Sequence, residues 1–440
     1  MLKRVGETVS TRVAVREASF PSPFASTLEY AAPARGMWNI VHTGMLIPEA
    51  HQIFVCAAGC LRGVVLTAAE MGAQERFSTI AVRENNVRDG DMEELILDGV
   101  GDILSKLAKR PPAILLYTSC IHHFMSCDLA RVYSELRERY PDVAFTDCYM
   151  NPIMRKSGLT PDQLMRARLY SLLLPRPLDE NTVAILGNDL PTDETSELYG
   201  ILRRAGKTVR DITACRTYGE YQEMAAASLY ITTYPSAKSG GEQLSRRLGG
   251  RHLYLPMCFI SAEIEDNLHR LEDAMGLPPA DYAAAKAASD TALDETAVLL
   301  GNTPVAIDYT AHPRPLGLAK LLLEHGIAVR EVYIDTIAEE ERPAFDWLRA
   351  HAPVLALRPT VAPAMRVAPR AASETLAVGQ KAAYFTGTDR FVNIVEGGGL
   401  YGFDGITRLA ALIADAFKTP KDTRSLIQIK GFGCGGGCAL

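Results

Sequence analysis

Residues 113–120 read AILLYTSC. Apolar and β-prone residues run to Thr118, a small polar pair stops them, and a segment of helical spacing follows. That order is typical of a buried strand of a parallel sheet that leads into a helix. Comparable runs recur and are expected to be strands; they lie at 143–146, 183–187, 229–233, 253–257, 305–309, 329–335 and 354–357. The sequence therefore predicts an α/β protein.

Turn-rich and helical segments divide this pattern into three Rossmann-like units, each expected to have a parallel sheet flanked by helices. The break PRPLDENT at 175–182 follows the first unit, and an Ala- and acid-rich helical stretch at 262–301 precedes the third. We predict an N-terminal α/β domain over 1–176, a second α/β domain with the helical connection over 177–300, and a third α/β domain with a Gly- and Cys-containing tail over 301–440.

The composition argues against several classes of partner. The 440 residues include 46 Lys and Arg against 52 Asp and Glu, which gives a net charge of −6, and no run of five like charges occurs. We therefore expect neither nucleic acid nor a membrane surface as a partner. No signal-peptide core is present and no stretch approaches the ~18–20 apolar residues of a membrane span, so we predict a cytoplasmic protein. Neither GxxxxGK(S/T) nor a GxGxxG motif between a strand and a helix occurs, so no nucleotide is expected to bind this chain.

The chain has nine cysteines, an odd number in a protein too long to depend on disulfides. Cys120 ends a predicted strand, and the carboxyl ends of parallel strands face the crevice in which α/β proteins bind ligands. Cys56 and Cys60 form a CxxxC pair beside Gly59 and Gly63, which favour a helix start whose free amides would stabilise a thiolate. Soft thiolates suit iron–sulfur chemistry, and a buried core role is the alternative for each cysteine.

Five segments resemble the first domain of the nitrogenase component 1 superfamily. They are RGMWNIVHTGMLIPEAHQIFVCAAGCLRGVV at 35–65, REN at 83–85, GDMEELILDGVGDIL at 90–104, AILLYTSCIHHFMSCDL at 113–129 and VAFTDCYMNPIMRKSG at 143–158. The matching features are Gly59-Cys60, Glu84-Asn85 with Gly90, and Ser119-Cys120 with Asp128. More loosely, GGGLYGFDGITRLAALIADAF at 397–417 resembles the opening of a late helix in these proteins. The superfamily includes nitrogenase subunits, their assembly scaffolds and light-independent protochlorophyllide and chlorophyllide reductases.

The resemblance implies an iron–sulfur cluster, P-cluster-like 8Fe-7S or 4Fe-4S, that three cysteines per subunit hold at the interface of two related subunits. Cys60 and Cys120 match two of these ligands. The third would fall near Met37, where the chain has no cysteine. Cys56 is the candidate replacement, and Cys148 is a further possible ligand.

The same resemblance implies that the chain is one subunit of a nitrogenase-like reductase. Electrons would come from a separate, ATP-dependent homodimeric iron protein, and the related α/β subunits would form a hetero-oligomer, expected to be α2β2. Within the superfamily the sequence is most similar to the methylthio-alkane reductase group, which implies reductive C–S cleavage of a small molecule. The alternatives are a tetrapyrrole (protochlorophyllide-type) reductase subunit, a nitrogenase-cofactor assembly scaffold, and a small-molecule-binding α/β protein without metal.

Other residues carry weaker expectations, and no catalytic residue is assigned. The positions where nitrogenase catalytic subunits anchor their cofactor resemble Thr233 and Tyr401, neither of which binds iron readily. Functional and structural roles stay open for His42, His51, His122 and His123. Cys434 and Cys438 could ligate a metal or exchange redox equivalents, whereas Cys215 and Cys258 are expected in the core. Five apolar residues are candidates either for a patch that a partner covers or for the core; they are Met45, Leu46, Ile47, Ile53 and Phe54.

Overall fold

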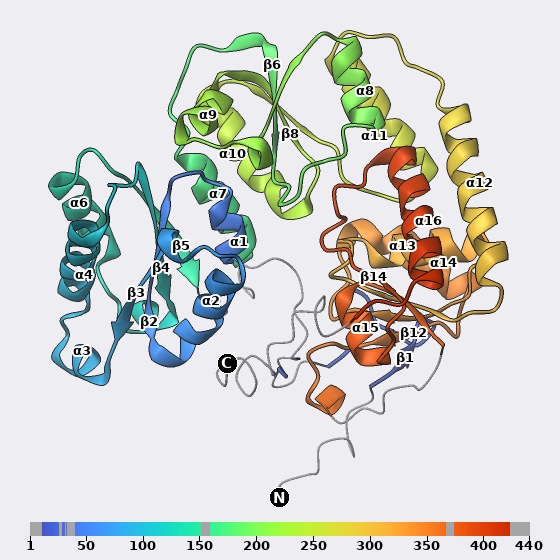
Figure 1. Ribbon diagram of the computed structural model, residues 1–440, viewed down its shortest axis with the longest axis horizontal. Coiled ribbons are helices and arrows are strands. Elements are labelled where there is room, and N and C mark those ends of the chain that lie inside the picture. Colours follow the sequence, from blue (N-terminus) through green and yellow to red (C-terminus); the bar gives the residue numbers. More distant parts are fainter. Residues whose placement is uncertain are drawn as a thin grey trace, which may run out of the picture. The chain divides into compact units, whose positions relative to one another are not determined.

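A computed structural model describes residues 11–25, 29–30, 32, 40–150, 159–366 and 374–422. The chain forms two compact units. The two-sheet unit comprises the described residues of Trp38–Pro191 and Gly206–Pro256, and the one-sheet unit comprises those of Met1–Met37, Thr192–Ala205 and Met257–Leu440. Figure 1 shows helices packed beside the sheets in both units. The predicted α/β class is confirmed.

The first sheet of the two-sheet unit is fully parallel and has the order β3-β2-β4-β5. Its strands are β2 (His51–Ala57), β3 (Phe77–Val82), β4 (Ala113–Ser119) and β5 (Ala144–Met150). Its helices are α1 (Ile40–Met45), α2 (Ala58–Glu70), α3 (Glu84–Asp89), α4 (Met92–Lys106), α5 (Cys120–Phe124), α6 (Leu129–Arg139) and α7 (Pro161–Ser171), with a short 3-10 turn η1 (Gln74–Arg76).

Both faces of this sheet are buried, because successive side chains of a strand point to opposite faces. Phe54 and Tyr117 belong to the core on the side of α1, α2 and α7. Ile53 and Leu116 belong to the core on the side of α4 and α6. These helices lie on opposite sides of the sheet in Figure 1. Of the five apolar candidates, Ile47, Ile53 and Phe54 are fully buried, while Met45 and Leu46 pack against the core.

The second sheet of this unit is also parallel and has the order β7-β6-β8-β9. Its strands are β6 (Asp179–Leu186), β7 (Thr208–Asp211), β8 (Ala227–Thr232) and β9 (Arg251–Tyr254). Helices α9 (Tyr218–Glu223) and α10 (Lys238–Leu248) accompany it, with 3-10 turns η3 (Ile212–Ala214), η4 (Met224–Ala226) and η5 (Pro235–Ala237). The buried Arg166 of α7 donates to the Gly187 carbonyl at 2.7 Å and pairs with Asp189 at 2.8 Å, which ties α7 to the end of β6.

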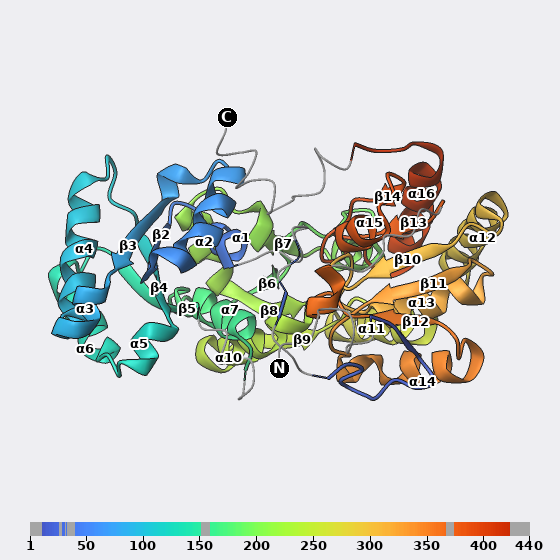
Figure 2. The same cartoon turned by 90° about the horizontal axis from the view of Figure 1, so that it is seen from below.

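The sheet of the one-sheet unit has the order β1-β12-β11-β10-β13-β14. Its strands are β1 (Val13–Ala14), β10 (Val305–Asp308), β11 (Val329–Tyr333), β12 (Ala356–Arg358), β13 (Leu376–Val378) and β14 (Phe391–Val392). Only the pairing of β1 with β12 is antiparallel. The helices are α8 (Glu197–Arg204), α11 (Ser261–Ala274), α12 (Ala283–Leu300), α13 (Pro315–Glu324), α14 (Arg342–His351), α15 (Gln380–Thr386) and α16 (Gly402–Lys418), with turns η6 (Glu339–Glu341) and η7 (Pro363–Arg366). Figure 2 shows β10 to β13 side by side.

Every predicted run overlaps a strand, with ends shifted by a few residues, whereas β1, β2, β3, β7, β13 and β14 lie outside the predicted runs. Each sheet draws its parallel strands from one of the three predicted segments, while β1 from the N-terminal segment joins the sheet of the third. The domain boundaries at 176 and 300 stay a prediction. In the part of the chain that the structure describes, no helix has both the length and the apolar character that a membrane crossing requires.

Candidate functional site

Two of the predicted cluster cysteines follow neighbouring parallel strands. β2 and β4 are adjacent, with Val55 beside Thr118, and both strands end at the same edge of the first sheet. Cys60 is the third residue of α2, which starts directly after β2. Cys120 is the first residue of α5, which starts directly after β4, so the predicted position of Cys120 at a strand end is confirmed.

A third cysteine, Cys56, lies close to both of them. It is a residue of β2 and is 0% exposed. Burial, and then the charges of Cys60 and Cys120, raises the pKa of its thiol to about 12. Cys56 is the last residue but one of β2, while Cys60 and Cys120 follow the ends of β2 and β4, so the three cysteines lie at the same edge of the sheet.

The three thiols differ in their access to a ligand. Cys60 is exposed, Cys120 is partly exposed, and Cys56 is buried in the core between the sheet and its helices. A cluster ligand must lose its proton and face the metal, so Cys60 and Cys120 fit an iron–sulfur group better than Cys56 does. Among the residues that the structure describes, no group of three or more His, Cys, Asp or Glu side chains is already arranged to hold a metal ion.

Cys148 belongs to the same hydrophobic core as Cys56 but lies on another strand. It is a fully buried residue of β5, beside Tyr117 of β4 in the register. Burial raises the pKa of its thiol well above the usual range, and the charge of Asp147 raises it further. Its contacts are those of a core residue.

The histidines near the cysteines are hydrogen-bonded parts of the fold. His51 is buried and its Nε2 lies 2.8 Å from the Ser78 hydroxyl. Burial, and then the charge of Arg76, lowers its pKa to about 4. His42 and His122 are buried as well, and the Nδ1 of His122 accepts from the backbone N–H of Ser119 at 3.2 Å. His123 is exposed.

Several sequence expectations concern residues elsewhere in the chain. Cys215 is partly buried beside Met224, at an S–S distance of 3.7 Å, and Cys258 is buried, as expected of core residues. Met37, Cys434 and Cys438 lie outside the described residues.

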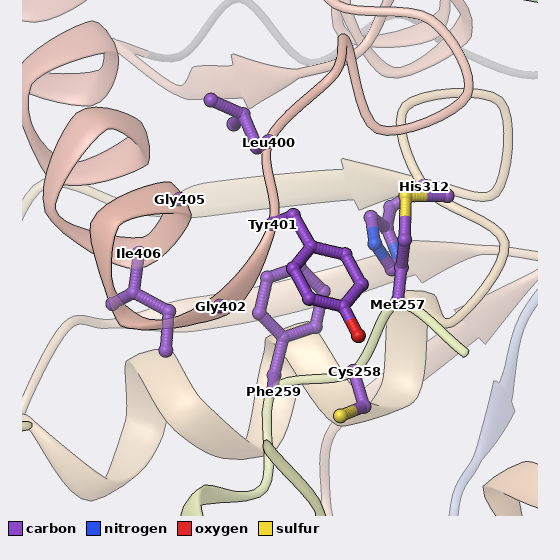
Figure 3. Close-up of a pocket in the computed structure, with 9 residues that line it drawn as sticks. All are labelled: Met257, Cys258, Phe259, His312, Leu400, Tyr401, Gly402, Gly405 and Ile406. Atoms are coloured by element: carbon purple, nitrogen blue, oxygen red, sulfur yellow. The ribbon is translucent and has the colours of Figure 1, made fainter. Parts of the chain in front are cut away.

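A small pocket in the one-sheet unit gathers sulfur, imidazole and phenol groups (Figure 3). Its lining includes Met257, Cys258, Phe259, His312 and Tyr401. The cavity measures about 10 Å³, which is room for about one water molecule and for no metal cluster. We infer no multi-metal cofactor in this pocket.

His312 is neutral and fixed in this pocket. The backbone N–H of Arg314 donates to its Nδ1 at 3.0 Å, and its ring lies 4.3 Å from that of Phe259 between centroids. Burial, and then the charge of Arg314, lowers the pKa of His312 to about 3. Burial raises the pKa of the Cys258 thiol to about 12. One sequence signal could have indicated His312, namely its place three residues after the predicted strand at 305–309.

A turn at residues 396–399, with positive φ throughout, closes the pocket. Glu396 and the three glycines after it all have positive φ, with 51° at Glu396 and 81° at Gly397. Their backbone N–H groups bond to the loop after β10, from Glu396 to Thr310 O at 2.8 Å and from Gly397 to Ala311 O at 2.7 Å. A side chain at Gly397 would come within 3.1 Å of Met257 Sδ and 3.2 Å of His312, so the turn requires glycine there.

The two positions that resemble cofactor anchors hold no metal donor of the expected kind. Thr233 is buried in the two-sheet unit, and its hydroxyl donates to Asn188 Oδ1 at 3.3 Å. Tyr401 is buried in the small pocket of the one-sheet unit. The residues present therefore do not fit the anchoring of a nitrogenase-type active-site cofactor at these two positions.

Comparison with known proteins gives the family. The model of the nitrogenase component 1 type oxidoreductases matches residues 41–418, so the chain belongs to this family. Members of this family generally bind iron–sulfur clusters and form hetero-oligomers that work with an iron protein. A search of curated proteins finds no match.

Solved structures described as nitrogenase share the fold. "Nitrogenase Cp1 at pH 6.5" has a TM-score of 0.65 and 13% identity, and the match covers 90% of this chain and 94% of that one. "Nitrogenase Cp1 at pH 5" has a TM-score of 0.56 and 14% identity, with coverage of 93% and 94%. The chain is therefore a nitrogenase-like oxidoreductase subunit by family and has the corresponding fold.

Proposed function

We propose that this subunit shares an iron–sulfur cluster with a related subunit and binds it through Cys60 and Cys120. The observation that carries the proposal is the pair of accessible thiols at the ends of two adjacent parallel strands. When bound, the cluster would supply one-electron transfer at low potential. The residues of this chain would hold the cluster at the edge of the first sheet where β2 and β4 end. Cys56, which is buried at the same edge, is the third proposed ligand. Cys148 is a further possible ligand.

Exposed apolar side chains near the two thiols support a partner at this edge. Val65 of α2 is 42% exposed, and Phe124 and Met125, at and after the end of α5, are 66% and 44% exposed. All three lie within five residues of Cys60 or Cys120. Apolar surface of this kind marks protein interfaces. A related α/β subunit that covers it would also provide the ligands that complete the four or more cysteines of such a cluster.

The proposed reaction is the two-electron cleavage of a methylthio-alkane in the cytoplasm. Electrons would come from a homodimeric ATP-dependent iron protein, and a P-cluster-like 8Fe-7S or a 4Fe-4S cluster in an α2β2 complex would supply the electron transfer toward the substrate. In balanced form, R–S–CH3 with two electrons and two protons gives R–H and CH3SH. The quoted segment at 35–65 supports this substrate class through its resemblance to methylthio-alkane reductases.

The test is turnover by the complete system. The chain, its related subunit and the iron protein are purified without oxygen and given ATP, reductant and a methylthio-alkane. Release of methanethiol that depends on ATP supports the proposal. Reduction of protochlorophyllide instead would assign a tetrapyrrole reductase, and transfer of the cluster to an apo-protein without turnover would assign an assembly scaffold.

A further inference from the structure

We propose that Tyr309 and Lys381 form a proton-donating site in the one-sheet unit, in which the Tyr309 hydroxyl supplies a proton to the reduced substrate and Lys381 positions it. The proposal rests on the proposed reductase function, because reductive cleavage consumes protons as well as electrons. Near the cysteines, His51 and His122 are buried, and each has one ring nitrogen in a hydrogen bond within the fold.

The pair lies where an open α/β sheet binds its ligands. Within the sheet, β11 and β12 lie on one side of β10, and β13, which comes later in the chain, lies on the other side of β10. β10 and β13 therefore flank the topological switch point, and ligands bind outside the carboxyl ends of the strands there. Tyr309 directly follows β10, and Lys381 lies three residues after the end of β13.

The contacts leave the proton of Tyr309 available. Lys381 Nζ donates to the Tyr309 hydroxyl at 2.7 Å and to Thr360 Oγ1 at 3.2 Å. An ammonium has donors only, so this bond occupies a lone pair of the phenol oxygen and leaves its O–H for another acceptor. Lys381 is 7% exposed, whereas Tyr309 is partly exposed and can exchange protons with solvent.

A buried carboxylate fixes the geometry of the pair. Asp308, the last residue of β10, accepts from the backbone N–H groups of Thr310 at 2.8 Å, Ala311 at 3.2 Å and Ala382 at 2.6 Å. It thereby joins the loop that carries Tyr309 to the helix that carries Lys381. Gly379 has a φ of 110°, and a Cβ there would overlap the Asp308 carboxylate, so the close approach of the two segments requires glycine.

A second observation at the same edge points to a ligand. Gln380, next to Lys381, is 7% exposed, and its Nε2 donates to Asn393 at 2.8 Å. Its Oε1 is buried and has no hydrogen-bond partner among the described residues. Buried polar atoms are normally paired, so this acceptor is a further group that a bound molecule would satisfy.

The proposed cleavage balances in electrons, protons and atoms, and the part of Tyr309 in it is a proton transfer. Two electrons from the iron protein break the C–S bond and leave a carbon fragment and methanethiolate, each with an electron pair. The O–H bond of Tyr309 breaks, a C–H bond forms on the carbon fragment, and the tyrosinate that remains lies beside the Lys381 ammonium. Solvent then returns a proton to Tyr309 and protonates methanethiolate.

The first test is turnover of the complete complex with Tyr309→Phe, Lys381→Arg and Lys381→Met. Loss of a general acid typically lowers the rate by ~10²–10⁴. We expect Tyr309→Phe to lower methanethiol release about 100-fold at unchanged iron content and to remove the solvent deuterium isotope effect. Lys381→Arg should retain more activity than Lys381→Met. Tyr384→Phe, a change in α15 outside this pair, is the matched control.

Wild-type turnover by Tyr309→Phe would overturn the proposal, and so would a loss of turnover that merely follows a loss of iron. Failure of the proposed function looks different, because the wild-type complex would then release no methanethiol at all.

A second readout does not depend on turnover. The hydrogen bond at the Tyr309 hydroxyl is followed by ultraviolet resonance Raman spectra of the wild-type complex and of Lys381→Met, each against its Tyr309→Phe counterpart. We expect the Tyr309 signal to change when the Lys381 donor is removed. Identical Tyr309 signals in the two proteins would overturn the assignment.

Discussion

Cys56 and Cys60 are four residues apart, yet they have opposite surroundings. Cys56 points into the core of the first sheet, while Cys60 is exposed on the first turn of α2. Because the thiolate is the nucleophile and the metal ligand, access and pKa together decide which cysteine reacts. At the residue scale, the structure thus favours Cys60 and Cys120 as ligands and gives Cys56 a supporting position.

The difference in burial between Cys56 and the other two cysteines predicts the order in which they are alkylated in the metal-free chain. With a pKa of about 12, the Cys56 thiol is about 10⁻⁴ ionised at pH 8, in addition to being buried. We expect iodoacetamide to modify Cys60 and Cys120 well before Cys56, as followed by peptide mass spectrometry. In denaturant the three should react alike. Equal rates in the folded chain would mean that Cys56 is accessible.

The lowered pKa of His51 predicts that the two-sheet unit loses stability in acid. Its pKa is about 4 in the folded chain and about 6.5 when unfolded, so the unfolded state binds more protons between these values. Stability should therefore fall as the pH is lowered from 6.5 to 4, by up to about 3 kcal/mol from this residue at about 1.4 kcal/mol per pH unit. Denaturant unfolding at several pH values measures the loss. His51→Gln should flatten the curve in this window, and an unchanged curve would contradict the assignment.

At the scale of elements, most of the residues for which we propose chemical roles follow strand ends. Cys60 and Cys120 follow β2 and β4, and Tyr309 and Lys381 follow β10 and β13. In the one-sheet unit, Asp308 and Gly379 let the segments after β10 and β13 approach each other closely. The short strands there depend on such contacts because each pairs over only a few residues.

The close contact between Gly379 and the Asp308 carboxylate predicts that two glycine substitutions will differ in their effect on stability. Gly379→Ala and Gly326→Ala both place alanine at positive φ, at a cost of about 1–2 kcal/mol. Only at Gly379 does the added Cβ meet another group, the Asp308 carboxylate; at Gly326 nothing lies within 4 Å. We expect Gly379→Ala to lower the free energy of unfolding by at least 2 kcal/mol more than Gly326→Ala does. Equal losses in calorimetry or denaturant unfolding would show that the contact is not rigid.

The sequence pattern predicted the elements near the site better than it predicted their long-range pairing. AILLYTSC identified β4 and the position of Cys120, because an apolar run that stops at small polar residues is a local signal. The pairing of Val13 and Ala14 with β12 could not be read locally, since it joins segments more than 300 residues apart. Nor could the Lys381–Tyr309 contact, which depends on the sheet order around β10.

On the scale of the whole molecule, the central claim is that a cluster is shared through Cys60 and Cys120. This chain offers two accessible thiols at one edge, fewer than the four or more ligands such clusters need. Val65, Phe124 and Met125, within five residues of these thiols, are exposed, and we propose that a partner covers this region. Cluster assembly and subunit association should therefore depend on each other.

The most direct test is the iron and acid-labile sulfide content, with the mass in solution, of the chain expressed alone and together with its related subunit under anaerobic conditions. We predict that only the hetero-oligomer is brown and iron-loaded, that Cys120→Ala and Cys60→Ala each remove most of this iron, and that Cys215→Ala, at a cysteine packed beside Met224 of the second sheet, does not. A stable monomer with a full complement of iron, or equal iron in Cys120→Ala and Cys215→Ala complexes, would contradict the shared cluster.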